Sequence, residues 1–284
     1  MYIRVYVRQR FLHLVLNWEQ DKSIIMSAIK GDSNMTDMIV IWEKNGIILQ
    51  RNEENGLLIL RMDRDENLFD MEMVNLLSIA IQKVERFNHP KSLLICGSSP
   101  NKFFSNGHDL GSVDQMSDMY TLVQSTWKKV LAPLLVMDCT TCACVNGHAF
   151  GAGFFLALSC DYRIMRTKRG FLNFPELNLG MPLSIGYAEL AKSKVPESLW
   201  RQAILTGKRY TSTEALKLHL IDQETSIDQL EPTCIKFLSS IMEQQSQLMK
   251  FDPSNYSAMK KELYKDAYRA LTMGHPKDPP HSRL

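Results

Sequence analysis

Short apolar runs alternate with stretches of helical periodicity from about residue 38 onward, and this alternation limits the folds open to the chain. Three apolar runs separated by Asn45-Gly46 and Asn55-Gly56 predict a β-meander. A helical repeat over 71–87 and an apolar strand at 92–96 follow, and such a strand–helix–strand unit requires parallel strands. The alternation continues as a helix over about 112–131, a strand over 134–145, a helix over 152–159 and a strand over 161–165. We therefore expect an α/β fold.

The chain beyond residue 183 is almost entirely helical in pattern. Two start signals support this: Thr211 and Glu214 have the spacing of a capping box, and Asp252 precedes a proline at a first helical position. The expected helices cover 184–194, 196–206, 211–220, 227–244 and 253–272. The sequence thus predicts an α/β core over 38–195 and an α-helical C-terminal region over 196–275.

Composition excludes several classes of protein. Lys plus Arg exceeds Asp plus Glu by 33 − 31 = 2, which is too even a balance to predict nucleic acid as a partner. No run of about 18 uncharged apolar residues occurs, so we expect no membrane span. The six cysteines lie mostly in apolar runs and are expected to be free, buried thiols. Cys139, Cys142 and Cys144 lack the second ligand pair of a zinc finger, so no metal site is predicted.

The two ends of the chain are expected to lie outside the fold. Residues 1–37 are predicted to be a basic leader or extension, and residues 1–35 could serve as a mitochondrial address. Residues 276–284 are predicted to be a flexible tail that ends in Ser282-Arg283-Leu284, which fits the peroxisomal Ser-Lys-Leu pattern. We expect a peroxisomal protein recognised by an import receptor, with the mitochondrion as the alternative.

Three loop segments carry the residues that we single out for chemistry: 102–110, 146–155 and 174–182. Glycines in the first two allow main-chain N–H groups to converge on a negatively charged oxygen, and a helix N-terminus adds partial positive charge. The alternative is that Gly151 and Gly153 only permit close packing of a helix on a strand. Asp109 precedes a helix and is expected to cap it, and His148 is expected to be a packing residue.

Taken together and in this order, the three segments resemble the enoyl-CoA hydratase/isomerase family, which has the crotonase fold. The resemblance covers about 38–275 and is closest to the peroxisomal enoyl-CoA delta isomerases, through 102–110 and 161–166. It implies a spiral of ββα repeats with an α-helical C-terminal trimerisation region, and hence a homotrimer. It also implies a fatty enoyl-CoA substrate whose thioester oxygen lies between the backbone N–H groups of His108 and Ala152. By the same resemblance, the expected substrate-binding residues are Lys102, Ser105, Asn106, Gly107, Gly151 and Phe155.

The number of carboxylates separates the possible reactions. Hydratases of the family use two glutamates; one corresponds to Glu176, and the other to Phe155, which cannot transfer a proton. Moving a double bond from C3 to C2 needs one carboxylate, so the resemblance favours a Δ3-Δ2-enoyl-CoA isomerase of fatty acid β-oxidation, with Glu176 as acid and base. No cofactor is needed, since coenzyme A is part of the substrate. A hydratase, a thioester hydrolase and a non-catalytic acyl-CoA-binding module remain alternatives.

Overall fold

The structure is a computed structural model, and it describes residues 38–98 and 102–274. The expectations for the leader and for the Ser-Arg-Leu terminus lie outside the described residues. Within this part of the chain, no helix combines the length and the hydropathy needed to cross a bilayer.

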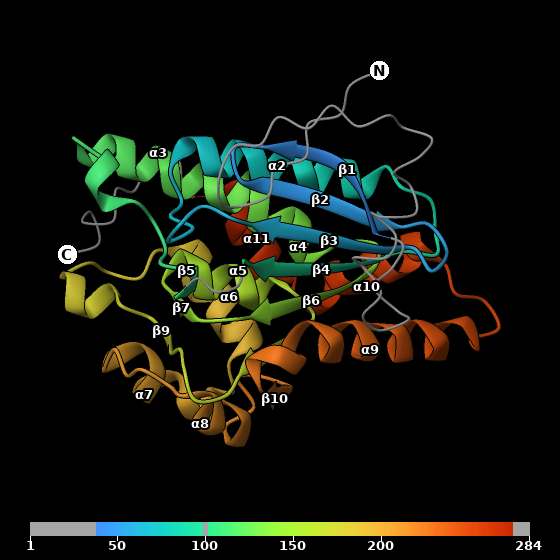
Figure 1. Cartoon of the computed structure of the whole chain (residues 1–284). Helices are drawn as coiled ribbons and strands as arrows, with labels where there is room; N and C mark the ends of the chain where they lie inside the picture. Colours follow the sequence, from blue (N-terminus) through green and yellow to red (C-terminus); the bar gives the residue numbers. More distant parts are fainter. Residues whose placement is uncertain (1–37, 99–101, 275–284) are drawn as a thin grey trace, which may run out of the picture. The chain divides into compact units, whose positions relative to one another are not determined.

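A seven-stranded sheet forms the centre of the fold (Figure 1). Its first strands are the predicted meander, and the remaining neighbours pair in parallel from β3 onward. In spatial order the strands are β1 (Met38–Lys44), β2 (Ile47–Asn52), β3 (Leu57–Met62), β4 (Ser92–Gly97), β6 (Thr140–Val145), β8 (Tyr162–Arg166) and β10 (Gln223–Thr225). Strands β4 and β6 are buried along their whole length, because helices cover both faces of the sheet.

A second, three-stranded sheet is the element that positions the loops of interest. It consists of β5 (Phe103–Ser105), β7 (His148–Phe150) and β9 (Leu172–Asn173), which pair in parallel. Strands of two or three residues are too short to show a periodicity, and the sequence prediction missed all three. Strands β5 and β7 lie within the segments 102–110 and 146–155, and β9 ends directly before the segment 174–182.

The N-terminal half contributes helices that pack beside the sheet. Asp70 caps α2 (Met71–Glu85) by accepting a hydrogen bond from the Met73 amide. Further along, α3 (Met116–Thr126), the π-helical turn η2 (Trp127–Leu131) and α4 (Ala132–Leu135) form a continuous helical stretch. Helix α5 (Ala152–Ser159) is buried at every position and lies where it was predicted.

The C-terminal half is mainly helical, as predicted. It contains α6 (Ile185–Lys194), α7 (Trp200–Leu205), α8 (Ser212–Lys217), α9 (Ile227–Ser246), α10 (Pro253–Leu263) and α11 (Lys265–Met273), with short 3-10 turns η1 (Leu110–Ser112), η3 (Glu176–Leu179) and η4 (Glu197–Leu199) elsewhere in the chain. The capping box of Thr211 with Glu214 and the cap of Asp252 are both confirmed. Helix α9 lies against β4, β6, β8 and β10 (Figure 1).

Two boundaries and one strand of the C-terminal half also differ from the prediction. The expected strand over 134–145 is helix α4 as far as Leu135, and β6 begins only at Thr140. Leu134 and Leu135 are fully buried, and an apolar run cannot distinguish a buried helix end from a buried strand. The helix expected over 253–272 divides at Tyr264 into α10 and α11. Strand β10, which was not expected, brings part of the C-terminal half into the seven-stranded sheet.

Buried polar contacts tie the C-terminal helices to the core. The Lys260 ammonium of α10 lies 2.6 Å from Asp161 Oδ2 and donates to the Cys139 carbonyl at 2.9 Å. The Asp161 carboxylate also accepts from the Thr141 amide and hydroxyl, so its charge is compensated on several sides. All six cysteines are buried as free thiols, which confirms that prediction.

Candidate active site

The three loop segments meet at one edge of the small sheet. Because β5, β7 and β9 are parallel, their carboxyl ends lie side by side, and residues 106–110, 151–155 and 174–182 of the three segments follow these ends directly. A Cβ added to Gly107 would lie 2.8 Å from the Phe150 carbonyl oxygen and 3.5 Å from the Ala152 amide nitrogen. A Cβ added to Gly151 would lie 3.5 Å from Cγ of Pro175. Thus the tertiary structure brings together residues that are about 70 positions apart in the chain.

The first loop is held by side-chain hydrogen bonds. The Ser105 hydroxyl donates to the Asn67 carbonyl at 2.7 Å and accepts from the Gly107 amide at 3.2 Å. The Asn106 side chain donates to the Glu66 carboxylate at 2.6 Å. Gly107 has a φ of +85°, a backbone conformation that residues with a side chain rarely adopt. Asp109 caps the following turn, as predicted.

The second loop places a helix N-terminus beside the first. Gly151 has a φ of +48°, and α5 begins at the next residue, Ala152. The first amides of a helix have no partner within the helix, so this end is suited to bind a negatively charged oxygen. Gly153 serves packing, because a Cβ there would lie 2.5 Å from the Ser105 carbonyl oxygen. Gly153 therefore fits the interpretation of close packing, and Gly151 fits the interpretation in which backbone N–H groups can face a negatively charged oxygen.

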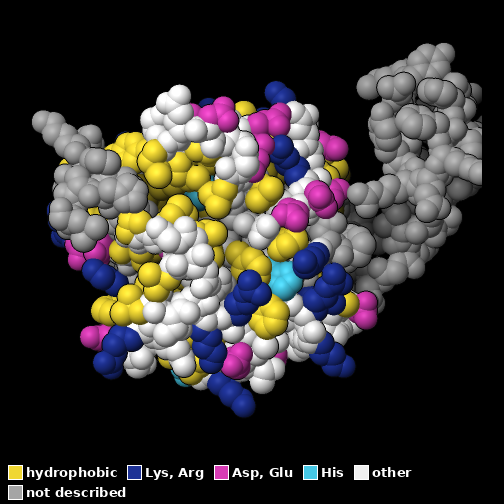
Figure 2. All heavy atoms as spheres, turned by 90° about the vertical axis from the view of Figure 1, so that its left-hand side faces the viewer, with side chains coloured by type: hydrophobic (Ala, Val, Ile, Leu, Met, Phe, Trp, Pro, Cys, Tyr) yellow, Lys and Arg dark blue, Asp and Glu magenta, His cyan; other side chains and the backbone are white. Residues whose placement is uncertain are grey.

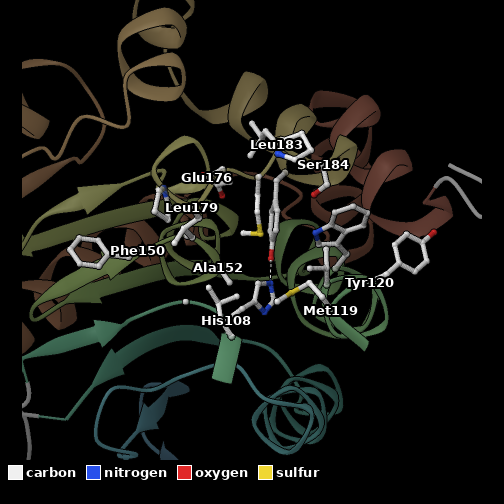
Figure 3. A pocket seen from close by; sticks show the side chains of 18 of the residues that line it. His108, Met119, Tyr120, Phe150, Ala152, Glu176, Leu179, Leu183 and Ser184 are labelled. Atoms are coloured by element: carbon white, nitrogen blue, oxygen red, sulfur yellow. Dashed lines mark hydrogen bonds between the residues drawn. The ribbon is translucent and has the colours of Figure 1, made fainter. Parts of the chain in front are cut away.

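A cavity of about 950 Å³ opens where the loops meet, which is ample for an organic ligand. Asn106, Gly107, His108, Gly151, Ala152 and Glu176 line it, together with apolar side chains of α3 and of the segment 179–185, among them Met116, Met119, Val123, Leu179, Leu183 and Ile185. In the close view, Glu176 and Leu179 lie above Ala152 and His108, and Met119 and Tyr120 lie to the right (Figure 3). The lining is thus largely hydrocarbon with few polar groups.

Glu176 is the unusual polar group of the cavity. Its Oε2 atom is buried and has no hydrogen-bond partner among the described residues, and burial raises the pKa of this carboxyl to about 7. Two other carboxylates of the lining are engaged, since Glu66 accepts from Asn106 and Glu189 pairs with Lys192 at 2.7 Å. A carboxylate with a pKa near 7 is suited to accept and return a proton.

Three of the predicted substrate-binding residues are not part of the lining. Ser105 is fully buried within the first loop segment, and Phe155 is also fully buried and does not border the cavity. Lys102 is exposed and lies over the Phe103 ring. The side chain of Phe155 instead stacks on Tyr187 of α6, with ring centroids 4.0 Å apart.

Tyr187 and His108 form a hydrogen-bonded pair in the cavity wall. The His108 Nε2 atom lies 2.7 Å from the Tyr187 hydroxyl (Figure 3). Burial lowers the pKa of His108 to about 4, so the imidazole is neutral at physiological pH. Neither Tyr187 nor Glu66 was predicted as a site residue from the sequence. Both are remote in sequence from the loop glycines, and no local pattern connects them to the site.

A group of cations lies next to the cavity, around His148. Burial, followed by the charges of Lys102, Arg169 and Arg209, lowers the pKa of His148. Figure 2 shows lysine and arginine side chains around a histidine on the face where the strands end, beside a region rich in hydrophobic side chains. The His148 ring stacks on Phe171 and contacts Phe150, a residue of the cavity lining, so its expected packing role is confirmed.

The fold and the site together agree with one known family. Residues 52–281 match the family described as enoyl-CoA hydratase/isomerase. The chain belongs to this family. Similar proteins include "Enoyl-CoA delta isomerase 3" of Arabidopsis thaliana, 29% identical over 79% of this chain and 94% of that protein. "Enoyl-CoA delta isomerase 2, peroxisomal" of the same plant is 29% identical over 76% of this chain and 91% of its own length.

Solved structures of the enoyl-CoA hydratase/isomerase family share the fold. The human mitochondrial delta3-delta2-enoyl-CoA isomerase superposes with a TM-score of 0.71 at 19% identity, over 81% of this chain and 87% of that one. This likeness confirms the crotonase fold for the chain. The family membership makes the chain an enzyme that acts on enoyl-CoA, by isomerisation or by hydration.

Proposed function

We propose that this member of the enoyl-CoA hydratase/isomerase family is a Δ3-Δ2-enoyl-CoA isomerase. Glu176 removes a proton from C2 of a 3-enoyl-CoA, and the electron pair of the broken C–H bond forms a C1–C2 double bond as the π electrons of the thioester carbonyl move onto its oxygen. The resulting dienolate oxygen is bound by the backbone N–H groups of His108 and Ala152. Glu176 then returns the proton to C4, which uses the π electrons of the C3–C4 double bond. The carbonyl re-forms, the C1–C2 electron pair moves to C2–C3, and the product is the 2-enoyl-CoA.

The proposal rests on the burial of the Glu176 carboxylate and on its lack of a hydrogen-bond partner in the described part of the chain. Its buried Oε2 has no hydrogen-bond partner among the described residues, while the other carboxylates of the lining do. A reaction in which the same carboxyl group takes up and returns the proton needs only one such group. General base catalysis contributes about 10²–10⁴-fold in rate, and each donor to the oxyanion about 3–4 kcal/mol.

Hydration is the second candidate, and one observation favours it. Glu66 also lines the cavity, and its carboxylate could orient a water molecule. Against this, Glu66 is bound to Asn106, whereas Phe155 occupies the position that corresponds to the second glutamate of hydratases. A thioester hydrolase would likewise require a positioned water.

An assay of the purified protein with two substrates tests the proposal. We expect 3-enoyl-CoA to be converted to 2-enoyl-CoA, and 2-enoyl-CoA to gain water slowly or not at all. Fast hydration of 2-enoyl-CoA without bond migration would replace the proposal by hydration, and release of free coenzyme A would replace it by thioester hydrolysis. Binding without turnover would indicate an acyl-CoA-binding module.

The cations around His148 support binding of the phosphates of coenzyme A. Lys102, Arg169 and Arg209 surround a stacked aromatic group that contacts Phe150 at the cavity. No ion pair between these cations and a carboxylate occurs within residues 38–98 and 102–274. Unpaired cations next to aromatic rings suit a phosphorylated nucleotide.

We also propose a homotrimer in the peroxisome. Large exposed apolar side chains lie on and beside the C-terminal helices: Leu248, Met249, Met259, Leu263 and Met273. Such exposure is typical of an interface, and light scattering measures whether three copies associate.

The name of a plant relative includes the word peroxisomal, and deletion of Ser282-Arg283-Leu284 from a fluorescent fusion should leave it outside peroxisomes. Delivery to mitochondria instead would assign the address to residues 1–35.

A further inference from the structure

The position of the missing second glutamate is covered by a different residue. Phe155 stands there in the sequence, but its side chain is fully buried and does not line the cavity. Tyr187 lies over it, with the two rings nearly parallel at 17° and 4.0 Å apart. The surface that faces a substrate at this place therefore belongs to Tyr187.

Three contacts fix the Tyr187 ring. One face stacks on Phe155, the Trp127 ring meets it edge-on with centroids 5.5 Å apart, and the hydroxyl is hydrogen-bonded to His108 at 2.7 Å. Burial raises the pKa of the Tyr187 hydroxyl and lowers that of His108 to about 4. The pair is thus uncharged across the pH range in which Glu176 titrates.

Tyr187 also lies near the proposed base. Both residues line the same cavity, and after burial the charge of Glu176 is the next cause that raises the pKa of Tyr187. A water molecule near Glu176 would exchange its proton during the reaction or add to the product. A fixed aromatic ring at this place fills the volume that such a water would need.

We propose, on the basis of the isomerase function, that Tyr187 is a specificity-determining residue that keeps water away from the reacting carbons, and that His108 positions it. The proton then stays on Glu176 between its removal from C2 and its return to C4. This role goes beyond the backbone N–H group of His108, because it uses the imidazole side chain.

The polar groups around Tyr187 indicate that water stays out of this part of the cavity only while the Tyr187 ring fills it. The Trp127 indole N–H is buried beside the Tyr187 hydroxyl and makes no hydrogen bond of good geometry within the described residues. Removal of the ring would leave a space bordered by this N–H, by His108 Nε2 and by Glu176. A space with polar partners of this kind takes up water, whereas an apolar one stays dry.

The test measures solvent deuterium in the product. The unchanged protein converts 3-enoyl-CoA in D₂O at low conversion, and mass spectrometry gives the deuterium at C4 of the 2-enoyl-CoA and the amount of 3-hydroxyacyl-CoA. Tyr187→Leu should raise the deuterium content at least about threefold and form measurable 3-hydroxyacyl-CoA. Tyr162→Leu is the matched control, since Tyr162 packs on Phe237 and does not line the cavity.

Two further variants test the positioning role and do not alter α6. His108→Leu should raise the deuterium content at least about twofold, because Tyr187 loses its hydrogen bond. His108→Gln, which can still bond to the hydroxyl, should restore a low content. If Tyr187→Leu does not fold, the comparison of His108→Leu with His108→Gln is sufficient to test the inference.

The outcomes separate the inference from the proposed function. Isomerisation by Tyr187→Leu with the deuterium content of the unchanged protein overturns the inference and leaves the isomerase proposal intact. Equal deuterium in His108→Leu and His108→Gln overturns the positioning role. Absence of isomerisation in the unchanged protein overturns the proposed function, and the inference with it.

Discussion

A Cβ on Gly107 would lie 3.5 Å from the amide nitrogen of Ala152, so the two glycine-containing loops are in direct contact. This contact relates the end of β5 to the first residue of α5 and places both loops at the cavity that Glu176 lines. The site therefore depends on how closely three separate segments approach one another, and the following predictions test its parts.

Gly107→Ala should abolish most of the activity. The added Cβ would lie 2.8 Å from the Phe150 carbonyl oxygen, and the φ of +85° disfavours alanine. We expect the loop to shift, with a loss of kcat of at least about 10²-fold if the His108 amide leaves the oxyanion. Gly111→Ala in the same loop is the control, because its Cβ would have one neighbour, Asp109 Oδ1 at 3.4 Å. Similar kcat in the two variants would speak against a role of this loop.

Glu176→Gln should lower kcat at least about 10²-fold and change KM little, because the amide retains the shape but cannot accept the proton. Steady-state kinetics with 3-enoyl-CoA measure both constants. Glu262→Gln, at an exposed ion pair with Lys265, is the control. Turnover by Glu176→Gln at the rate of the control would remove Glu176 from the mechanism.

The rate of isomerisation should depend on pH through Glu176. Since the carboxylate form is the base, kcat/KM should rise about tenfold per pH unit below the pKa and level off above it. Burial places that pKa at about 7 instead of 4.5. A profile that is flat between pH 5 and 8, an interval of about three units, would contradict the assignment.

The same shift predicts an effect on stability. The folded protein binds the Glu176 proton more tightly than the unfolded chain, so the free energy of unfolding should fall as the pH rises from 4.5 toward about 7. Glu176→Gln removes this dependence and should be the more stable protein above pH 7. Denaturant unfolding of both proteins at low and high pH measures the difference. If the free energy of unfolding of the two proteins depended on pH in the same way, the Glu176 carboxylate would be solvated.

Arg209→Ser and Lys102→Ser should weaken substrate binding and leave the chemistry unchanged. Each removes one cation near His148, and we expect KM to rise about threefold to tenfold with little change in kcat. The dependence of KM on salt should also decrease. Lys217→Ser, at a residue that does not line the cavity, is the control. A fall in kcat alone would argue against a phosphate site.

Lys260→Met should destabilise the fold by about 3–5 kcal/mol, because it leaves Asp161 buried without its counter-ion. Lys265→Met removes a partner of the exposed Glu262 and should cost less than about 1 kcal/mol. Denaturant unfolding compares the two. Equal losses would mean that the Lys260–Asp161 contact behaves like a surface pair.

Most of the fold could be predicted because its elements are marked locally. The Asn-Gly turns delimit the meander, the apolar repeat of α2 has helical spacing, and the caps at Thr211 and Asp252 mark helix starts. The strands β5, β7 and β9 could not be predicted, since segments of two or three residues carry no periodicity. They are the elements that align the loops.

The glycines, Glu176 and the family resemblance were accessible from the residues alone, because backbone freedom and an isolated charge in an apolar stretch are local properties. Tertiary structure decided what faces the cavity. Phe155 was expected to meet substrate, but the packing of α6 on α5 places Tyr187 over it. It also decided the pKa of Glu176, since desolvation depends on every segment that surrounds the carboxyl, and these come from distant parts of the chain.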